Sequence, residues 1–197
     1  MKICIINGNA DNDADFEGYL DQLVSRLRKN NQVTDWGLRN MNLHFCNGCW
    51  NCWWKTPGIC SIKDDFHYIA RSCIDSNIIL FASPLIAGFP SSILKSVTDR
   101  MVGLLHPYIT LINGECHHRK RYPKYPNFGL LLKKEHDTDL LDLKIVVDIY
   151  KRLTINFHAD LLFVKFIDEF SPKSMYNEIT DFKRFAETKE KQFKNPG

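Results

Sequence analysis

Four cysteines lie close together between residues 44 and 65, in the stretch HFCNGCWNCWWKTPGICSIKDD. They follow the spacing C-x2-C-x2-C-x7-C, at Cys46, Cys49, Cys52 and Cys60. Short gaps let neighbouring thiolates converge on one centre, so the four could hold a tetrahedral zinc ion or a [4Fe–4S] cluster. Two other interpretations stay open: a redox disulfide between Cys49 and Cys52, and unligated thiols packed among the tryptophans.

The composition is that of a globular protein with one domain, which we take as residues 1–197. The chain is 44% hydrophobic and 25% charged, which is ordinary for a soluble protein of this length. Its net charge of +3 is too small to indicate a nucleic acid as partner. We expect no signal peptide and no membrane span, because no apolar run approaches the roughly 20 residues that cross a bilayer. A cytoplasmic location follows, where the seven cysteines are not expected to form a disulfide framework.

The rest of the pattern predicts strands that alternate with helices. Apolar runs predict five strands, at 2–7, 32–38, 77–83, 127–133 and 159–167. Amphipathic spacing predicts five helices, at 14–29, 65–75, 90–105, 138–157 and about 174–193. Pro90 would occupy the first turn of the third helix. This alternation favours the α/β class with one parallel sheet covered on both faces, and 2-1-3-4-5 is one of the two common strand orders.

The loop after the first strand, NGNADNDADF, lies where such sheets bind ligands. Backbone amides at a helix N-terminus can cradle a phosphate there. Four acidic side chains oppose this, with no Lys or Arg nearby in the sequence: Asp11, Asp13, Asp15 and Glu17. A carboxylate about 6 Å from a phosphate charge costs roughly 3 kcal/mol at an effective dielectric of about 20, whereas the helix terminus returns only about 0.3–1 kcal/mol. A phosphate therefore requires these side chains to point to solvent, and helix capping by Asn12 or Asp13 is the alternative explanation.

The loop after the third strand, SPLIAGFPSSILKSVTDRM, begins with a tight irregular turn that Pro84 and Gly88 indicate. Leu85, Ile86 and Ala87 would present backbone amides at the sheet edge. Such a surface suits a flat, partly apolar ring that needs a few main-chain contacts. The alternative is an ordinary strand-to-helix turn.

The segment 106–126 is predicted as a long loop without regular structure, and loops of this kind are usually lids or binding elements. Its stretch CHHRKRYPK holds several cationic side chains. They could meet a phosphate-bearing substrate such as NADPH, and His117 or His118 could donate a proton. A solvated loop is the alternative.

Together these pieces resemble the flavodoxin-like NAD(P)H-dependent FMN reductase family, including its iron–sulfur flavoprotein branch. The likeness is carried by CNGCWNCWWKTPGICSIKDD and SPLIAGFPSSILKSVTDRM and covers about residues 1–165. Family members show similar Asp-Asp, Ser-Pro, Leu-Lys and Asp-Arg pairs, which here are Asp64, Asp65, Ser83, Pro84, Leu94, Lys95, Asp99 and Arg100. NGECHHRKRYPKYP also resembles a feature of one subgroup.

The resemblance implies a flavodoxin-like three-layer sandwich of order 2-1-3-4-5, with FMN held by the loops after strands 1, 3 and 4. The implied cofactor-binding residues are Gly8, Asn9, Asp11, Asn12, Ser83, Pro84, Leu85, Ile86, Ala87, Gly88, Lys133 and Glu135. In the iron–sulfur branch, the four cysteines would hold a [4Fe–4S] cluster near the flavin. The first loop departs from the family's Gly-Ser pattern, because residues 8–13 contain no hydroxyl group.

The resemblance predicts an oxidoreductase that takes electrons from NAD(P)H through FMN, and through a cluster where one is present, to a small-molecule or protein acceptor. It also implies a homodimer or higher homo-oligomer, since flavin sites of this fold are often completed by a neighbouring subunit. The alternative is a flavodoxin-like binding or regulatory protein that has lost FMN binding and acts through 106–126, with cysteines that hold zinc or no metal. An electron-carrier flavodoxin is less favoured, because such carriers are usually strongly acidic.

Overall fold

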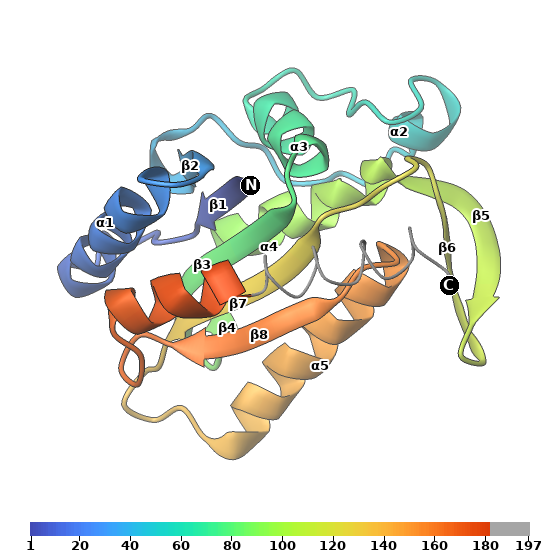
Figure 1. Ribbon diagram of the computed structural model, residues 1–197. Coiled ribbons are helices and arrows are strands. Elements are labelled where there is room, and N and C mark those ends of the chain that lie inside the picture. The colour runs from blue at the N-terminus through green and yellow to red at the C-terminus, as the bar shows by residue number, and fades with distance from the viewer. Residues whose placement is uncertain (182–197) are drawn as a thin grey trace, which may run out of the picture.

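A five-stranded parallel sheet forms the centre of the molecule (Figure 1). The computed structural model describes residues 1–181. The strands are β1 (Lys2–Asn7), β2 (Gln32–Gly37), β3 (Ile78–Ile86), β7 (Asn127–Lys133) and β8 (Leu161–Phe166). Their order is β2-β1-β3-β7-β8, and all four pairings are parallel. The predicted order 2-1-3-4-5 is therefore confirmed.

Helices cover both faces of the sheet and complete three layers. The long helices are α1 (Ala14–Arg28), α3 (Phe66–Asp75), α4 (Ser92–Arg100) and α5 (Leu140–Asn156). A further helix occupies 172–181, and the rest of the predicted C-terminal helix lies outside the described residues. Helix α1 and the 172–181 helix cover one face, and α3, α4 and α5 cover the other (Figure 1). Each group contributes side chains to the core on its own face. No helix in the described part is both long enough and apolar enough to cross a membrane.

Strand β1 shows why the central strands read as continuous apolar runs. Ile3 and Ile5 belong to the core under α1, whereas Cys4 and Ile6 belong to the core on the opposite face. Successive side chains of a strand point to opposite faces, so a strand covered on both sides needs apolar residues at every position.

The predicted helix 90–105 is shorter than the sequence indicated. Pro90 lies in the two-residue strand β4 (Phe89–Pro90), which pairs antiparallel with the end of β3, so its predicted place in the helix is wrong. Ser91 caps α4 instead, because its hydroxyl accepts from the Leu94 amide. The helix ends at Arg100 and continues as the 3₁₀ turn η2 (Met101–Leu104).

The segment 106–126 is not a structureless loop, and that prediction is wrong. It contains an antiparallel hairpin of β5 (Leu105–Ile112) and β6 (Glu115–Lys120). The connection is Asn113–Gly114, with φ of 52° and 83°. An Asn-Gly pair between strand-like runs is a strong sequence signal for a two-residue hairpin turn, and it was present in the sequence.

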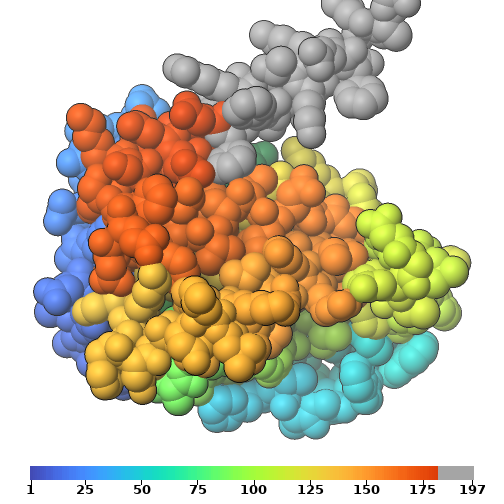
Figure 2. Space-filling model, turned by 90° about the horizontal axis from the view of Figure 1, so that it is seen from below, coloured from blue at the N-terminus to red at the C-terminus, as the bar shows by residue number. Residues whose placement is uncertain are grey.

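Two short elements lie near the cysteines, one before the predicted excursion 44–65 and one within it. The 3₁₀ turn η1 (Leu38–Asn40) follows β2, and the single-turn helix α2 (Asn51–Trp54) lies among the cysteines. The excursion, residues 44–65, is called the cysteine segment below. Figure 2 shows it in cyan beside the yellow-green hairpin, at one end of the molecule.

Candidate functional site

Gly8 connects three elements at the edge where β1 and β3 end. Its amide donates to the Ala82 carbonyl at 2.7 Å, and its carbonyl accepts from the Ser91 hydroxyl at 2.5 Å. A Cβ at position 8 would lie 2.8 Å from the Leu94 Cβ. Gly8 is therefore required by the close approach of α4, and its amide is already bonded within the protein.

Residues 83–88, called the β3 tip below, continue β3 beyond the sheet and turn back into β4. Ala87 and Gly88 form the two-residue turn, with φ of 51° and 73°. The Ser83 hydroxyl holds the base of the tip, since it accepts from the Ser91 amide at 3.0 Å and donates to the Pro84 carbonyl at 2.7 Å. Ile86 is exposed, as is Ala87, whereas Leu85 is buried and does not lie at the surface as the sequence suggested.

The loop after β7 closes around the end of the β3 tip. The Gly88 amide donates to the Glu135 carboxylate at 3.3 Å, and the Glu135 amide donates to the Thr138 hydroxyl at 2.9 Å. A Cβ on Gly88 would lie 2.6 Å from a carboxylate oxygen of Asp142 in α5. The structure thus brings the predicted residues Gly88 and Glu135 together at one place.

Residues 8–13, called loop 1 below, are held by a network of side-chain hydrogen bonds. Asp13 caps α1 by accepting from the Phe16 amide at 3.0 Å. The Asn9 side chain accepts from the Asp13 amide at 3.0 Å, and donates to the Asp13 carbonyl at 2.9 Å and to Glu17 at 2.8 Å. The Asn9 amide donates to the Asn7 side chain at 2.9 Å. Helix capping, the alternative explanation of the acidic residues, accounts for Asp13.

Two cations that are distant in the sequence lie against loop 1. The Lys133 Nζ is 2.5 Å from Asp13 and 3.7 Å from Asp15. The Arg39 guanidinium donates to the Asn9 carbonyl at 3.0 Å and lies 3.8 Å from Glu17. Partial burial by itself would raise the pKa of Asp13, but the hydrogen bonds from Lys133 and the Phe16 amide, with the charge of Lys133, together outweigh it and lower that pKa. No Lys or Arg lies near loop 1 in the sequence, but these two cations lie against it in the folded structure, so the prediction that loop 1 has no cation nearby is wrong.

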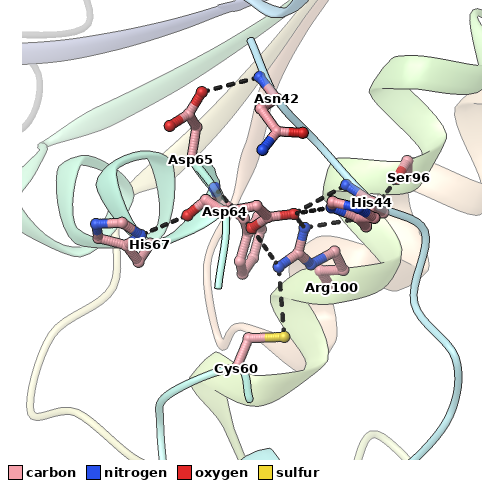
Figure 3. A network of polar contacts seen from close by, with 9 residues as sticks. Asn42, His44, Cys60, Asp64, Asp65, His67, Ser96 and Arg100 are labelled. Carbon is pink, nitrogen blue, oxygen red and sulfur yellow. Dashed lines mark hydrogen bonds and ion pairs between the residues drawn. The ribbon is translucent and has the colours of Figure 1, made fainter. Parts of the chain in front are cut away.

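The cysteine segment is tied to the end of α4 by a buried ion pair (Figure 3). Arg100 donates to the two oxygens of Asp64 at 2.6 and 2.8 Å, and both side chains are buried. Arg100 also donates to the His44 carbonyl at 3.0 Å and contacts the Cys60 sulfur at 3.4 Å. Burial alone would raise the pKa of Asp64, but the bonds from Arg100 and from the His44 amide hold it well below its usual range. Two of the residues that carry the family resemblance thus anchor the segment.

The four cysteines line one cavity of about 180 Å³, together with Asp99 and Arg100. All seven cysteines of the chain are free thiols. A hydrogen bond with Ser61 lowers the pKa of Cys49, whereas burial and then the neighbouring cysteines raise the pKa of Cys52. Within residues 1–181, no three His, Cys, Asp or Glu side chains are arranged as ligands of one metal ion. The thiols share a cavity without forming a metal site in this arrangement.

The cysteine cavity and the β3 tip lie at opposite ends of α4. Ser91, the N-cap, contacts loop 1 and the base of the tip, whereas Arg100, the last residue, lines the cavity. A helix of nine residues rises roughly 13 Å. The cysteine cavity and the β3 tip are therefore separated by about the length of this helix.

The histidines of the hairpin are also distant from the β3 tip. His117 is buried against Asn156, the last residue of α5, at 3.2 Å, and the His118 amide donates to the same side chain at 3.3 Å. The first turn of α5 contacts Gly88, and 17 residues of helix rise about 25 Å. Within one chain, neither histidine can pass a proton to a ring at the tip. His118 instead packs against Trp53, with ring centroids 5.1 Å apart.

No protein-family model matches the chain, and no curated protein matches it significantly. Solved structures do share its arrangement of elements. They include an NAD(P)H:quinone oxidoreductase from Methanothermobacter marburgensis, with a TM-score of 0.59, 11% identity, and 84% of this chain and 85% of that one covered. The chain has the flavodoxin-like fold. An FMN-dependent NADH-azoreductase from Bacillus anthracis in complex with FMN shares this fold at a TM-score of 0.58, with 10% identity over 95% of this chain and 99% of that one. So does Smu.1420 from Streptococcus mutans, at 0.56, with 15% identity over 93% and 99%.

On this flavodoxin-like fold, an FMN site would need a surface for the ring at the β3 tip and a place for the phosphate at loop 1. The β3 tip offers an exposed apolar residue, Ile86, next to main chain and to Glu135, and this fits a flat ring. Loop 1 does not fit a phosphate group. The amides of Gly8, Asn9 and Asp13 are bonded within the protein, and a carboxylate, that of Asp13, caps the helix terminus that would receive the phosphate.

Sequence reasoning missed two residues of this region, Arg39 and Ser91, and also the pairing of Lys133 with Asp13. These contacts emerge only from the fold. Ser91 follows a proline and precedes a helical pattern, which is a recognised capping signal. Nothing in the sequence indicated that Arg39 or Lys133 would reach loop 1.

Proposed function

We propose that the chain is a flavin-dependent NAD(P)H oxidoreductase that passes electrons to a small-molecule or protein acceptor. The observation that carries this proposal is the β3 tip, which the bonds of Ser83 and Ser91 fix at the carboxyl edge of the sheet. This edge, near the switch between the first and third strands, is where sheets of this order bind ligands. The names of the quinone oxidoreductase and azoreductase of similar fold support the same reaction class.

The residues of the tip would bind and orient the ring. Ile86 supplies an apolar surface that keeps water from one face of the ring, and the two-residue turn at Ala87 and Gly88 fixes the position of the backbone. Glu135 holds the Gly88 amide and so sets the distance between the β3 tip and the loop after β7. A bound flavin would supply the redox chemistry, and the protein supplies its position and surroundings.

The test is direct binding of a flavin to the purified protein, followed by oxidation of NADH and of NADPH. Ile86→Glu places a charge on the proposed ring surface and should abolish both binding and turnover. Ile109→Glu is the matched control, because Ile109 is similarly exposed, 47% against 40%, and lies on the hairpin. Full flavin binding by Ile86→Glu, or no binding of any flavin by the unaltered protein, would defeat the proposal.

The cysteine cavity is proposed as the site of a [4Fe–4S] cluster that acts as a second electron carrier. Its support is chemical: four thiols, the ligand type that holds such clusters, line one cavity. The thiols would have to converge on loading. Iron and acid-labile sulfide should both be present after anaerobic purification and absent from Cys49→Ser. A preparation without iron, even after reconstitution, would contradict the cluster and leave the flavin proposal standing.

Assembly into a homodimer or higher homo-oligomer is part of the proposal. Its support is an apolar stripe along the outer face of α5, where Leu141, Ile145 and Ile149 are exposed at intervals of four residues. The mass in solution, measured by light scattering, should be a multiple of that of one chain, and Ile145→Glu should reduce it. A monomer at all concentrations would refute this part.

The acceptor groups of loop 1 favour a second function, that of a flavodoxin-like binding or regulatory protein without a flavin. In that case the protein would work through the hairpin rather than the β3 tip. The flavin titration described above separates the two functions, because only the first requires a flavin to bind.

A further inference from the structure

Loop 1 offers hydrogen-bond acceptors at the position where a phosphate group needs donors. We infer that the proposed flavin site selects against the terminal phosphate of FMN and takes a flavin whose side chain ends in a hydroxyl group, such as riboflavin. This inference rests on the proposed function, because it concerns which flavin the same site accepts. Three observations lead to it: the backbone donors, the cations and the Asp13 carboxylate.

Three backbone donors of loop 1, the amides of Gly8, Asn9 and Asp13, are already used. The Gly8 amide is bonded to the Ala82 carbonyl, and the Asn9 amide is bonded to the buried Asn7 side chain. The Asp13 amide is bonded to the Asn9 side chain. A phosphate at a helix N-terminus is normally held by amides of this kind. Here it would have to displace several bonds that the protein makes to itself.

The cations near loop 1 are also paired. Lys133 contacts both Asp13 and Asp15, and Arg39 bonds to the Asn9 carbonyl beside Glu17. Among the described residues, this network therefore holds three carboxylates, those of Asp13, Asp15 and Glu17, but only two cations. Lys133 reaches Asp13 from the end of β7, on the far side of β3, so the pair bridges the edge of the sheet that a flavin side chain would cross.

Asp13 decides the chemistry, because an ionised carboxylate is only an acceptor. A phosphate monoester at neutral pH is also an acceptor and is negatively charged, so the two groups repel and share no proton. A hydroxyl group donates a proton to a carboxylate without adding charge. Asp13 stays ionised at neutral pH, since the hydrogen bond from Lys133 lowers its pKa. The site therefore matches a flavin with an uncharged polar end.

The experiment is a titration of the flavin-free protein with riboflavin and with FMN, followed by quenching of flavin fluorescence. Riboflavin should bind at least about tenfold more tightly than FMN, because the Asp13 carboxylate repels the FMN phosphate and, being partly buried, is only partly screened by water. Asp13→Ser keeps a helix-capping side chain and replaces the carboxylate with a donor, so it should remove or invert this preference. Asp11→Ser is the matched control, since Asp11 is exposed in the same loop, and it should change the ratio less than about threefold.

A second measurement needs no variant. Raising the salt concentration should strengthen FMN binding and leave riboflavin binding unchanged, because salt screens repulsion between charges. FMN that binds more tightly than riboflavin to the unaltered protein at low salt would overturn the inference and leave the proposed function intact. Failure of both flavins to bind would overturn the proposed function, and the inference with it.

Discussion

Arg100 and Asp64, 36 residues apart in the chain, form a two-point ion pair with N–O distances of 2.6 and 2.8 Å in the interior. The pair fixes the start of α3 and the cysteine segment to the end of α4. Removing one partner leaves the other charge buried without compensation, which typically costs about 3–5 kcal/mol.

Arg100→Met should therefore lower the unfolding free energy by roughly that 3–5 kcal/mol and make the cysteines react faster with a thiol reagent. Lys95→Met is the control, because Lys95 pairs with Asp99 on the exposed side of the same helix, and such pairs contribute about 0.3–0.5 kcal/mol. Urea unfolding and thiol titration measure the two effects. Equal losses in the two variants would show that the buried pair has no special role.

Stability should depend on pH through Asp64. Its pKa is lowered in the folded protein, so its contribution is complete above the unfolded-state value of about 3.9 and declines as the pH falls below that value. Unfolding free energy measured from neutral pH downwards should show this decline, and Asp64→Asn should make the profile flatter in the acid range. A variant profile parallel to that of the unaltered protein would contradict the assignment.

Gly8→Ala should destabilise the protein by about 1–3 kcal/mol, because the added methyl group overpacks a contact that cannot easily relax. The new Cβ would lie 2.8 Å from Leu94 Cβ and 2.9 Å from the Ser91 hydroxyl. Gly18→Ala is the matched control: it lies inside α1 with no atom within 4 Å of the added group, and it should stabilise by roughly 0.5–1 kcal/mol. Thermal unfolding compares the two, and a neutral Gly8→Ala would show that α4 can move away from loop 1.

Cys49 should be alkylated faster than Cys52 near neutral pH, because only the thiolate reacts. The Ser61 hydrogen bond lowers the pKa of Cys49, and burial raises that of Cys52. Ser61→Ala should slow the labelling of Cys49 and leave that of Cys52 unchanged, as peptide mass spectrometry of the labelled protein can measure. Faster labelling of Cys52 in the unaltered protein would contradict the order.

The strands and most helices could be predicted because their patterns are local. The apolar run of β3 and the spacing of α1 each reflect which faces are buried. The hairpin has an equally local signal, because the Asn113–Gly114 pair is typical of a two-residue turn between strands. The apolar repeat of α5 does not show which face of the helix is buried, because apolar residues lie on its exposed face as well as on its buried face.

The sequence by itself determined the order of elements, the parallel sheet and the grouping of the four cysteines, because each depends on residues near one another in the chain. Only the tertiary structure decided the surroundings of loop 1. Lys133 is 120 residues from Asp13 and Arg39 is 30 from Asn9, and their charges meet because parallel strands end at one edge of the sheet. It also decided that the cysteines lie away from the β3 tip, since the length of α4, rather than any spacing along the chain, separates the two.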